Sequence, residues 1–290
     1  MNFQRYMVYY NPKEWFSFIF KINKAETLRE LFPLMLAVGA YAGVVTYFLI
    51  DFWQLPDTSI LKKVIFIHQT IGFVFSLLLA FRINSAYDRW WEGRKIWGSL
   101  VNNSRNLAIK LKHLIGENEL AFFNYAIPRY ARALRDHLRD EYVPEEQSFI
   151  SVDAQKHVPN QVASEMIKNI YRLNKEGAIN PEQLFSITAE ITSFTDICGA
   201  CERIKKTPIP FSYNVFIKKF IFTYIMTLPF TWAFDLKYFI IPIICFVLFV
   251  FASIELLAEE IEDPFGRDAN DLPLDSICDN IQKHVGELIG

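Results

Sequence analysis

The chain has 290 residues, a formal net charge of −2 and 52% hydrophobic residues, including 27 Phe. This near-neutral charge gives no electrostatic basis for nucleic-acid binding. Four cysteines, one of them inside an apolar run, do not make a disulfide framework. Apolar residues gather toward both ends of the chain, whereas residues 112–210 have the composition of a charged helical protein. The distribution predicts a membrane protein with a polar helical middle.

The N-terminal part predicts one membrane span and a shorter helix before it. The N-terminus lacks a basic region followed by an apolar core, so we expect the spans themselves to direct insertion. Apolar residues at helical spacing in 13–24 indicate an in-plane interfacial helix or a packed N-terminal segment. Residues 31–50 are uncharged and long enough to span, with Pro33 in the first turn. Gly39 and Gly43 would allow close approach of another helix.

Residues 64–112 contain no proline and pass from an apolar run into a cationic one. At about 1.5 Å per residue such a helix would extend about 70 Å, more than twice the thickness of a bilayer core. We therefore predict a membrane-spanning helix that continues into water as a cationic stalk. The alternative is a helix that is broken at the membrane boundary.

The remainder of the chain predicts further helices. The middle divides into helical segments, with Gly177 after the second and Pro181 at the start of the third. Two apolar runs, 220–234 and 238–254, predict a hairpin of two spans with Pro229 and Pro242 as buried kinks. The expected fold is all-α, with four spans. Its expected parts are an N-terminal interfacial segment at 1–29, spans one and two at 30–82, a cytoplasmic helical region at 83–213, spans three and four at 214–258, and an acidic tail at 259–290.

Lysine and arginine residues set the expected orientation. They precede spans one and three and follow span two, whereas the opposite side has only Lys62, Lys63 and Lys237. This bias predicts a multi-pass protein of the cell (inner) membrane with both termini in the cytoplasm.

No enzyme signature is present: the chain lacks a GxSxG elbow, an HExxH pair, a Walker loop and a GxGxxG motif. We therefore predict that the protein is not an enzyme. The five histidines are scattered, and only His68 lies at span depth, where we favour a packing residue over a functional one. Cys198 and Cys201 form a CGAC pair, but no second pair and no βαβ pattern accompany it, which disfavours a redox or zinc site.

Two candidate sites remain. Phe73, Leu77 and Phe81 recur every fourth residue on one helix face, typical of core, of a lipid-facing surface or of a pore lining. After the last span, acidic residues surround a Pro-Phe-Gly turn at 264–266. They predict either an oxygen-ligand cation site or a solvated surface.

Three segments resemble the bestrophins, and bacterial members in particular: LLAFRINSAYDRWWEGRKIWGSLVNNSRNLA, ICGACERIKKTPIPFSY and AEEIEDPFGRDANDLPLD. With the four spans in the same order, the resemblance covers essentially the whole chain. It implies a homopentameric ion channel in the lipid bilayer, whose five second helices line one pore that passes small monovalent ions. The helical middle would then form a cytoplasmic vestibule.

The resemblance also implies site residues. The narrow apolar neck of the family falls on Phe73, Leu77 and Phe81. Its cytoplasmic aperture falls on Ile179. Its calcium clasp falls on Glu260, Asp263, Asp268 and Asp271. No cofactor is required for ion passage; Ca²⁺ is the ion that the clasp would take, and structural hydrogen bonding is the alternative.

The expected neck contains no ring of charged residues that would indicate whether anions or cations pass. Animal bestrophins pass chloride, whereas a preference for monovalent cations is open to bacterial relatives. The chain has slightly more acidic than basic residues, which disfavours an ion path that attracts anions. We therefore predict a cation preference, with a chloride channel as the alternative. The alternative of another class is a membrane-anchored scaffold or partner-binding protein; an inverted-repeat transporter is disfavoured because no matching interrupted segments occur in two halves.

Overall fold

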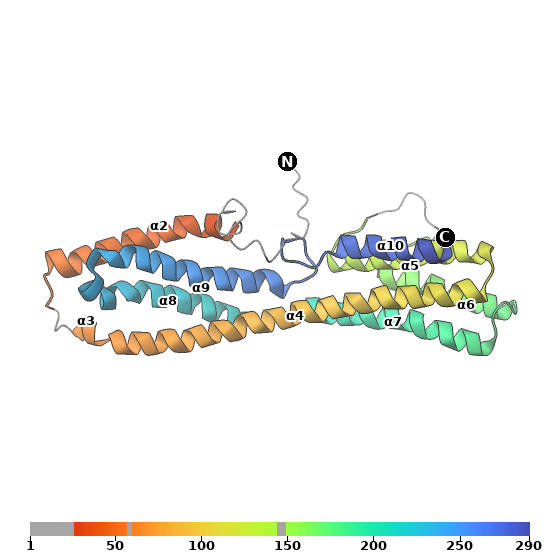
Figure 1. The fold of residues 1–290 in the computed structure, drawn as a ribbon, viewed down its shortest axis with the longest axis horizontal. Coiled ribbons are helices and arrows are strands. Elements are labelled where there is room, and N and C mark those ends of the chain that lie inside the picture. The colour runs from red at the N-terminus through yellow and green to blue at the C-terminus, as the bar shows by residue number, and fades with distance from the viewer. Residues whose placement is uncertain (1–25, 57–59, 144–148) are drawn as a thin grey trace. The chain divides into compact units, whose positions relative to one another are not determined.

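The computed structural model describes residues 26–56, 60–143 and 149–290, and these residues form helices and no β-strand (Figure 1). The predicted interfacial helix at 13–24 lies outside the described residues. The described chain divides into two compact units. We call residues 26–56, 60–88 and 209–262 the span unit, and residues 89–143, 149–208 and 263–290 the middle unit. The unit boundaries at 88/89, 208/209 and 262/263 lie four to six residues from the expected ones.

The span unit contains the apolar helices. In chain order its elements are α2 (Glu26–Thr46), a π-helical stretch η2 (Tyr47–Phe52), the short α3 (Ile60–Lys63), the first part of α4 (Ile65–Leu114), α8 (Phe211–Leu236), a 3₁₀ turn η3 (Lys237–Phe239) and α9 (Ile240–Glu262). Three segments are long and apolar enough to cross a membrane: Thr27–Phe52, Ile65–Leu114 and Phe211–Glu262. The last holds both α8 and α9, joined at η3, where Lys237 has a φ of 45°. The four expected span helices are therefore present, and the predicted hairpin is confirmed. Pro229 is buried inside α8, as predicted, whereas Pro242 is exposed in the first turn of α9, where proline does not interrupt the helix.

Close packing between α2 and α9 follows from two small residues. A Cβ atom added at Gly39 would lie 3.1 Å from Cys245 Sγ of α9, and one at Gly43 would lie 3.4 Å from Ile241. The absence of these side chains lets the two helices approach, as the sequence predicted. Buried Val38, Ala42 and their neighbours on α8 and α9 complete the core of the span unit.

The start of the first span helix differs from the prediction. We expected Pro33 in its first turn, whereas α2 already includes Glu26, so that Pro33 lies inside the helix. Residues 26–30, which include the charged Glu26, Arg29 and Glu30, belong to the helix because it extends beyond its apolar part, and hydrophobicity marks only that part.

The middle unit is a bundle of amphipathic helices. It contains the second part of α4, α5 (Glu117–Leu138), α6 (Val158–Lys175), α7 (Pro181–Lys206) and α10 (Leu274–Ile289). Helix α10 lies along α5, and α6 packs between α5 and α7 (Figure 1). The start of α7 carries a capping box between Asn180 and Gln183. Pro181 is the first residue of this helix, as the sequence predicted.

The core of the middle unit is built on large aromatic side chains from several helices. Trp97, Phe123, Tyr130 and Phe194 are fully buried. The Tyr130 hydroxyl donates to the Phe194 carbonyl oxygen over 2.6 Å, which gives this buried polar group a partner. The bundle thus has a core of its own, separate from that of the span unit.

Candidate functional site

Helix α4 is one uninterrupted helix of 50 residues, Ile65–Leu114, and no break occurs where its apolar part ends. Its first part belongs to the span unit and its second part to the middle unit. Of the two possibilities that the sequence left open, the continuous helix is present and the break at the membrane boundary is not. The absence of proline from the segment removes the commonest cause of a kink.

The apolar part of α4 has two faces of opposite character. Phe75 and Leu79 are 0% and 2% exposed. The predicted neck residues point away from that buried face: Phe73 is 74% exposed, Leu77 49% and Phe81 54%. The chain therefore leaves a stripe of three large apolar side chains without cover from its own core.

The buried face of α4 is fixed by aromatic contacts. Phe75 stacks on Phe220 of α8 at a centroid distance of 4.5 Å and meets Phe251 of α9 edge-on at 5.3 Å. The ring of Tyr224 comes so close to Gly72 that an added Cβ would lie 2.5 Å from its hydroxyl. These contacts set the rotation of α4, and thereby the direction in which the exposed stripe points.

His68 is a packing residue, as predicted. It is 5% exposed, and its ring stacks on Tyr224 at 4.1 Å. Its Nε2 lies 3.3 Å from the Tyr224 carbonyl oxygen and 3.2 Å from Thr227 Oγ1. The imidazole therefore connects α4 with α8 by ring stacking and by hydrogen bonding.

A buried charge cluster lies directly after the stripe. The guanidinium of Arg82 is fully buried, with its NH2 nitrogen 2.8 Å from Glu262 and its Nε 3.5 Å from Glu255. The other oxygen of Glu262 accepts the backbone N–H of Ile209 over 2.7 Å. This cluster connects α4 and α9 with Ile209, two residues before α8. It was not predicted, although an arginine directly after an apolar run and a glutamate directly after another are signals visible in the sequence.

Ile179 lies in the core of the middle unit. Its side chain is 1% exposed, and Asn174 donates to its carbonyl oxygen over 2.9 Å. A side chain that narrows a water-filled path must face that path, so this burial does not support an aperture at Ile179. The exposed apolar side chain nearby is Phe185, in the first turns of α7, which is 80% exposed.

One carboxylate of the acidic turn after α9 stabilises the turn by accepting a hydrogen bond from its backbone. Asp271 is 3% exposed, and its Oδ2 accepts the backbone N–H of Asp268 over 2.7 Å. A Cβ at position 266 would lie 2.6 Å from the same oxygen, so Gly266 is needed for this close approach. Phe265, fully buried, packs against Gly93 of α4 and anchors the turn.

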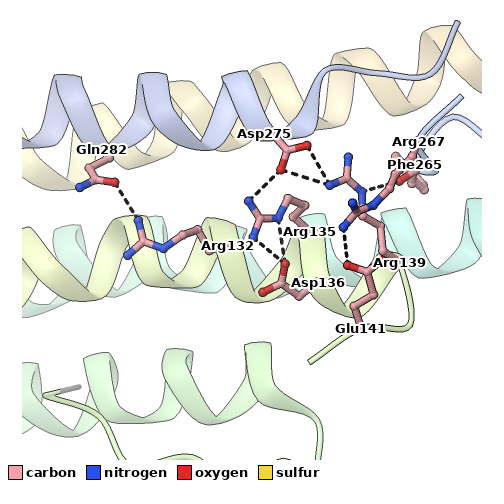
Figure 2. Close-up of polar contacts among 9 residues, drawn as sticks. All are labelled: Arg132, Arg135, Asp136, Arg139, Glu141, Phe265, Arg267, Asp275 and Gln282. Carbon is pink, nitrogen blue, oxygen red and sulfur yellow. Dashed lines mark hydrogen bonds and ion pairs between the residues drawn. The ribbon is translucent and has the colours of Figure 1, made fainter. Parts of the chain in front are cut away.

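Arginine side chains of α5 bind groups in the same turn and at the start of α10 (Figure 2). Arg139 donates to the Phe265 carbonyl oxygen over 3.3 Å and pairs with Asp275 at 2.9 Å. Arg135 also reaches Asp275, at 2.9 Å. Arg267 of the turn donates to Glu141 over 2.6 Å. The turn is therefore connected to α5 and to the start of α10 by direct hydrogen bonds and ion pairs.

The residues of the predicted calcium clasp fall in different environments. Asp263 and Asp268 are exposed, and Asp271 is buried and bonded within the turn. Glu260 belongs to the span unit and the three aspartates to the middle unit. Carboxylate oxygens are the donors that Ca²⁺ prefers, so the chemistry of the set fits this ion. One Asp271 oxygen, however, already accepts a backbone N–H.

The CGAC pair consists of two buried thiols on α7. Burial, together with the charge of Glu202, raises the pKa of Cys198 to about 12. Burial likewise raises the pKa of Cys201. Both thiols are therefore protonated at neutral pH, and a protonated thiol is a poor nucleophile.

Comparisons with known proteins agree with this arrangement. A family model described as "Bacterial/Fungal Bestrophin protein" matches residues 7–287. A voltage-dependent anion channel-forming protein of Nostoc sp. is 32% identical over 95% of this chain and 92% of its own length. One from Synechocystis sp. is 35% identical over 74% of this chain and 75% of its own length. A solved bacterial bestrophin homologue from Klebsiella pneumoniae superposes with a TM-score of 0.77 at 22% identity, covering 90% of this chain and all of that one.

The solved homologue shows that the fold is shared, and the family match extends over both units. The family is one of ion channels and not of enzymes, which confirms that prediction. The resemblance seen in the three sequence segments is confirmed as well. The chain belongs to the family of bacterial and fungal bestrophins.

Proposed function

We propose that the chain forms a pentameric ion channel in which α4 of each subunit lines the pore and Phe73, Leu77 and Phe81 form its neck. The observation that carries the proposal is the exposed stripe opposite the buried face of α4. In a pentamer each of these positions would become a ring of five apolar side chains. Such rings make a dry constriction that conducts when it widens or wets.

For the permeant ion we propose a preference for anions over cations. The support is the printed name of the Nostoc and Synechocystis relatives, which are voltage-dependent anion channel-forming proteins at 32% and 35% identity. This replaces the cation preference expected from the acidic balance of the chain. Overall charge is a poor guide because carboxylates such as Glu255 and Glu262 are buried and paired with Arg82.

The test is planar-bilayer recording of the purified protein under a salt gradient, where the sign of the reversal potential gives the preferred ion. Phe73→Ala and Leu77→Ala should each raise the open probability or the conductance, because a smaller side chain widens and wets the neck. Phe222→Ala is the matched control: Phe222 is an aromatic of α8 that is 61% exposed. Its removal should leave the current unchanged.

Three results would overturn parts of this proposal. A reversal potential of the cation sign would reject the anion preference alone. Currents that do not respond to Phe73→Ala and Leu77→Ala would reject the neck. No current in any condition would favour the alternative of a membrane-anchored scaffold. The oligomeric state is measured separately, by the mass of the detergent-solubilised particle.

A further inference from the structure

Three helix ends of the middle unit bring together two imidazoles and a carboxylate. His137 lies in the last turn of α5, His157 is the N-cap of α6, and Glu202 lies near the end of α7. One ligand atom from each lies within 4.8 Å of the other two. All three side chains are partly exposed, so an ion from solution can reach them. Neither the neck nor the acidic turn includes these residues.

The two imidazoles converge on one oxygen. His137 Nε2 lies 2.6 Å from Glu202 Oε1, and His157 Nε2 lies 2.9 Å from the same atom. In a tetrahedral zinc site with nitrogen and oxygen ligands at about 2.0–2.1 Å, neighbouring ligand atoms are about 3.3 Å apart. The ligand atoms would therefore have to separate by less than about 1 Å to admit the ion.

A fourth donor lies beside them. Cys198 Sγ is 3.9 Å from His157 Nε2. A thiolate at about 2.3 Å from zinc would lie about 3.5 Å from a nitrogen ligand, close to that separation. Cys198 and Glu202 are four residues apart on α7 and thus share one face of the helix.

The surroundings contain one favourable and four opposing features. Two of the opposing features are that His157 lies at the N-terminus of α6, whose dipole disfavours a cation, and that the buried Cys198 thiol has a raised pKa and must lose its proton to bind. The carbonyl ends of α5 and α7 favour a cation, since His137 and Glu202 lie near the C-termini of these helices. The ammonium of Lys206 lies 3.5 Å from the second oxygen of Glu202, but its side chain is 68% exposed and free to move away. His157 Nδ1 accepts the backbone N–H of Asn160 over 3.2 Å, and this capping bond is given up when Nε2 binds a metal.

We propose that His137, His157 and Glu202 bind a zinc-class transition-metal ion, with Cys198 as the fourth ligand. Two nitrogens, one oxygen and one sulfur form a ligand set suited to Zn²⁺ and unsuited to Ca²⁺ or Mg²⁺, which take oxygen ligands. A closed, four-ligand site of this kind is structural. It clamps the ends of α5, α6 and α7 together.

The experiment uses untagged, full-length protein in detergent, stripped with a chelator and titrated with ZnCl₂. Excess Ca²⁺ and Mg²⁺ are present to occupy sites made of oxygen alone. We expect one tightly bound zinc per chain by mass spectrometry of the metal, and a rise in the midpoint of thermal unfolding. His157→Asn is the informative variant because asparagine keeps the N-cap of α6 while removing the nitrogen ligand. It should weaken zinc binding at least about tenfold.

Matched controls lie in the same unit. His113→Gln changes an exposed histidine of α4 away from the cluster and should bind zinc as the wild type does. Co²⁺ in place of zinc should give a thiolate-to-cobalt absorption band. This band should be lost in Cys198→Ser and kept in Cys201→Ser.

Zinc binding by His157→Asn equal to that of the wild type would overturn the proposal, as would binding that excess Ca²⁺ abolishes. A wild type that binds no zinc would leave the cluster as an ion pair between imidazole and carboxylate, which also overturns it. A cobalt band that persists in Cys198→Ser would reject the sulfur ligand. None of these measurements depends on ion conduction.

Discussion

At the scale of single residues, the buried guanidinium of Arg82 is the most consequential group outside the neck. It is the cation that balances Glu255 and Glu262, and it directly follows Phe81 on α4. Removing one partner of a buried ion cluster leaves the other charges without compensation. The position of Phe81, the last residue of the proposed neck, therefore depends on an ion cluster within the span unit.

We predict that Arg82→Met lowers the free energy of unfolding by about 3–5 kcal/mol. Adding Glu255→Gln and Glu262→Gln should recover part of this loss, because the unbalanced carboxylates are then neutral. The measurement is the midpoint of thermal unfolding in detergent. Arg94→Met, at an exposed arginine of the same helix, is the control and should have little effect. Equal midpoints for Arg82→Met and Arg94→Met would contradict the prediction.

The sequence could indicate candidate pore residues but not which of them the chain itself would cover. Phe73, Leu77 and Phe81 were identified from a four-residue repeat and a family resemblance, and all three are exposed. Ile179 was identified from the resemblance alone, and its side chain is packed in a core. Periodicity gives a face of a helix, whereas a single position in a connecting segment has no periodicity from which its direction can be read.

At the scale of elements, the contact between α5 and α10 depends on Asp275 (Figure 2). Burial acts to raise the pKa of Asp275, but hydrogen bonds and charge from Arg139, with the charge of Arg135, outweigh it and hold the pKa below its usual range. A lowered pKa in the folded state means that the carboxylate stabilises the fold above its unfolded pKa of about 3.9. This stability is lost as the pH falls through the lower folded pKa.

We therefore expect Asp275→Asn to lower the unfolding midpoint at neutral pH, and the difference from the wild type to shrink below about pH 4. Since the side chain is 52% exposed, solvent screening limits the effect to about 1 kcal/mol or less. Asp279→Asn, at an exposed carboxylate of the same helix, is the control. A difference between the wild type and Asp275→Asn that grows on acidification would reverse the sign and reject the argument.

The acidic turn provides the second prediction at this scale. Because Asp271 and the arginines of α5 already hold the turn, we expect a calcium chelator to leave its stability unchanged. Asp271→Ala removes the acceptor for the Asp268 N–H and should cost about 1–3 kcal/mol, with or without Ca²⁺. Asp268→Ala keeps that N–H and should cost little. If Ca²⁺ raises the unfolding midpoint of the wild type but not of Asp268→Ala, the turn is a calcium site after all.

The residues at which helices end and begin were predictable because these signals depend only on neighbouring residues in the sequence. Gly177 and Pro181 mark the end of α6 and the start of α7 in the sequence and in the structure. The start of α2 was not predictable, since charged residues precede its apolar part. The cluster of His137, His157 and Glu202 could not be predicted from the sequence either. His137 and His157 are 20 residues apart, and His157 and Glu202 are 45 residues apart. They belong to the ends of three different helices, and only tertiary packing brings them together.

At the scale of the whole molecule, the two units differ in composition and each has its own core. The sequence predicted a single unit whose apolar spans and polar middle are distinguished by their hydrophobic patterns. The changes between its expected parts, at 82/83, 213/214 and 258/259, lie four to six residues from the boundaries between the two compact units, and one of these boundaries falls inside the uninterrupted helix α4. No local signal marks a unit boundary in the middle of a helix.

Orientation in the membrane is the last prediction, and it depends on charge alone. Arg203, Lys205, Lys206, Lys218 and Lys219 lie at the start of α8 or shortly before it, whereas the turn after α8 carries only Lys237. Positively charged residues near the ends of spans stay in the cytoplasm. A reporter fused after residue 237 should therefore reach the outer side, where alkaline phosphatase is active and green fluorescent protein is dark. The same reporters fused at residue 290 should give the opposite pair of signals. Phosphatase activity at residue 290 would place the middle unit outside, where the lysines and arginines before α8 would have had to cross the membrane.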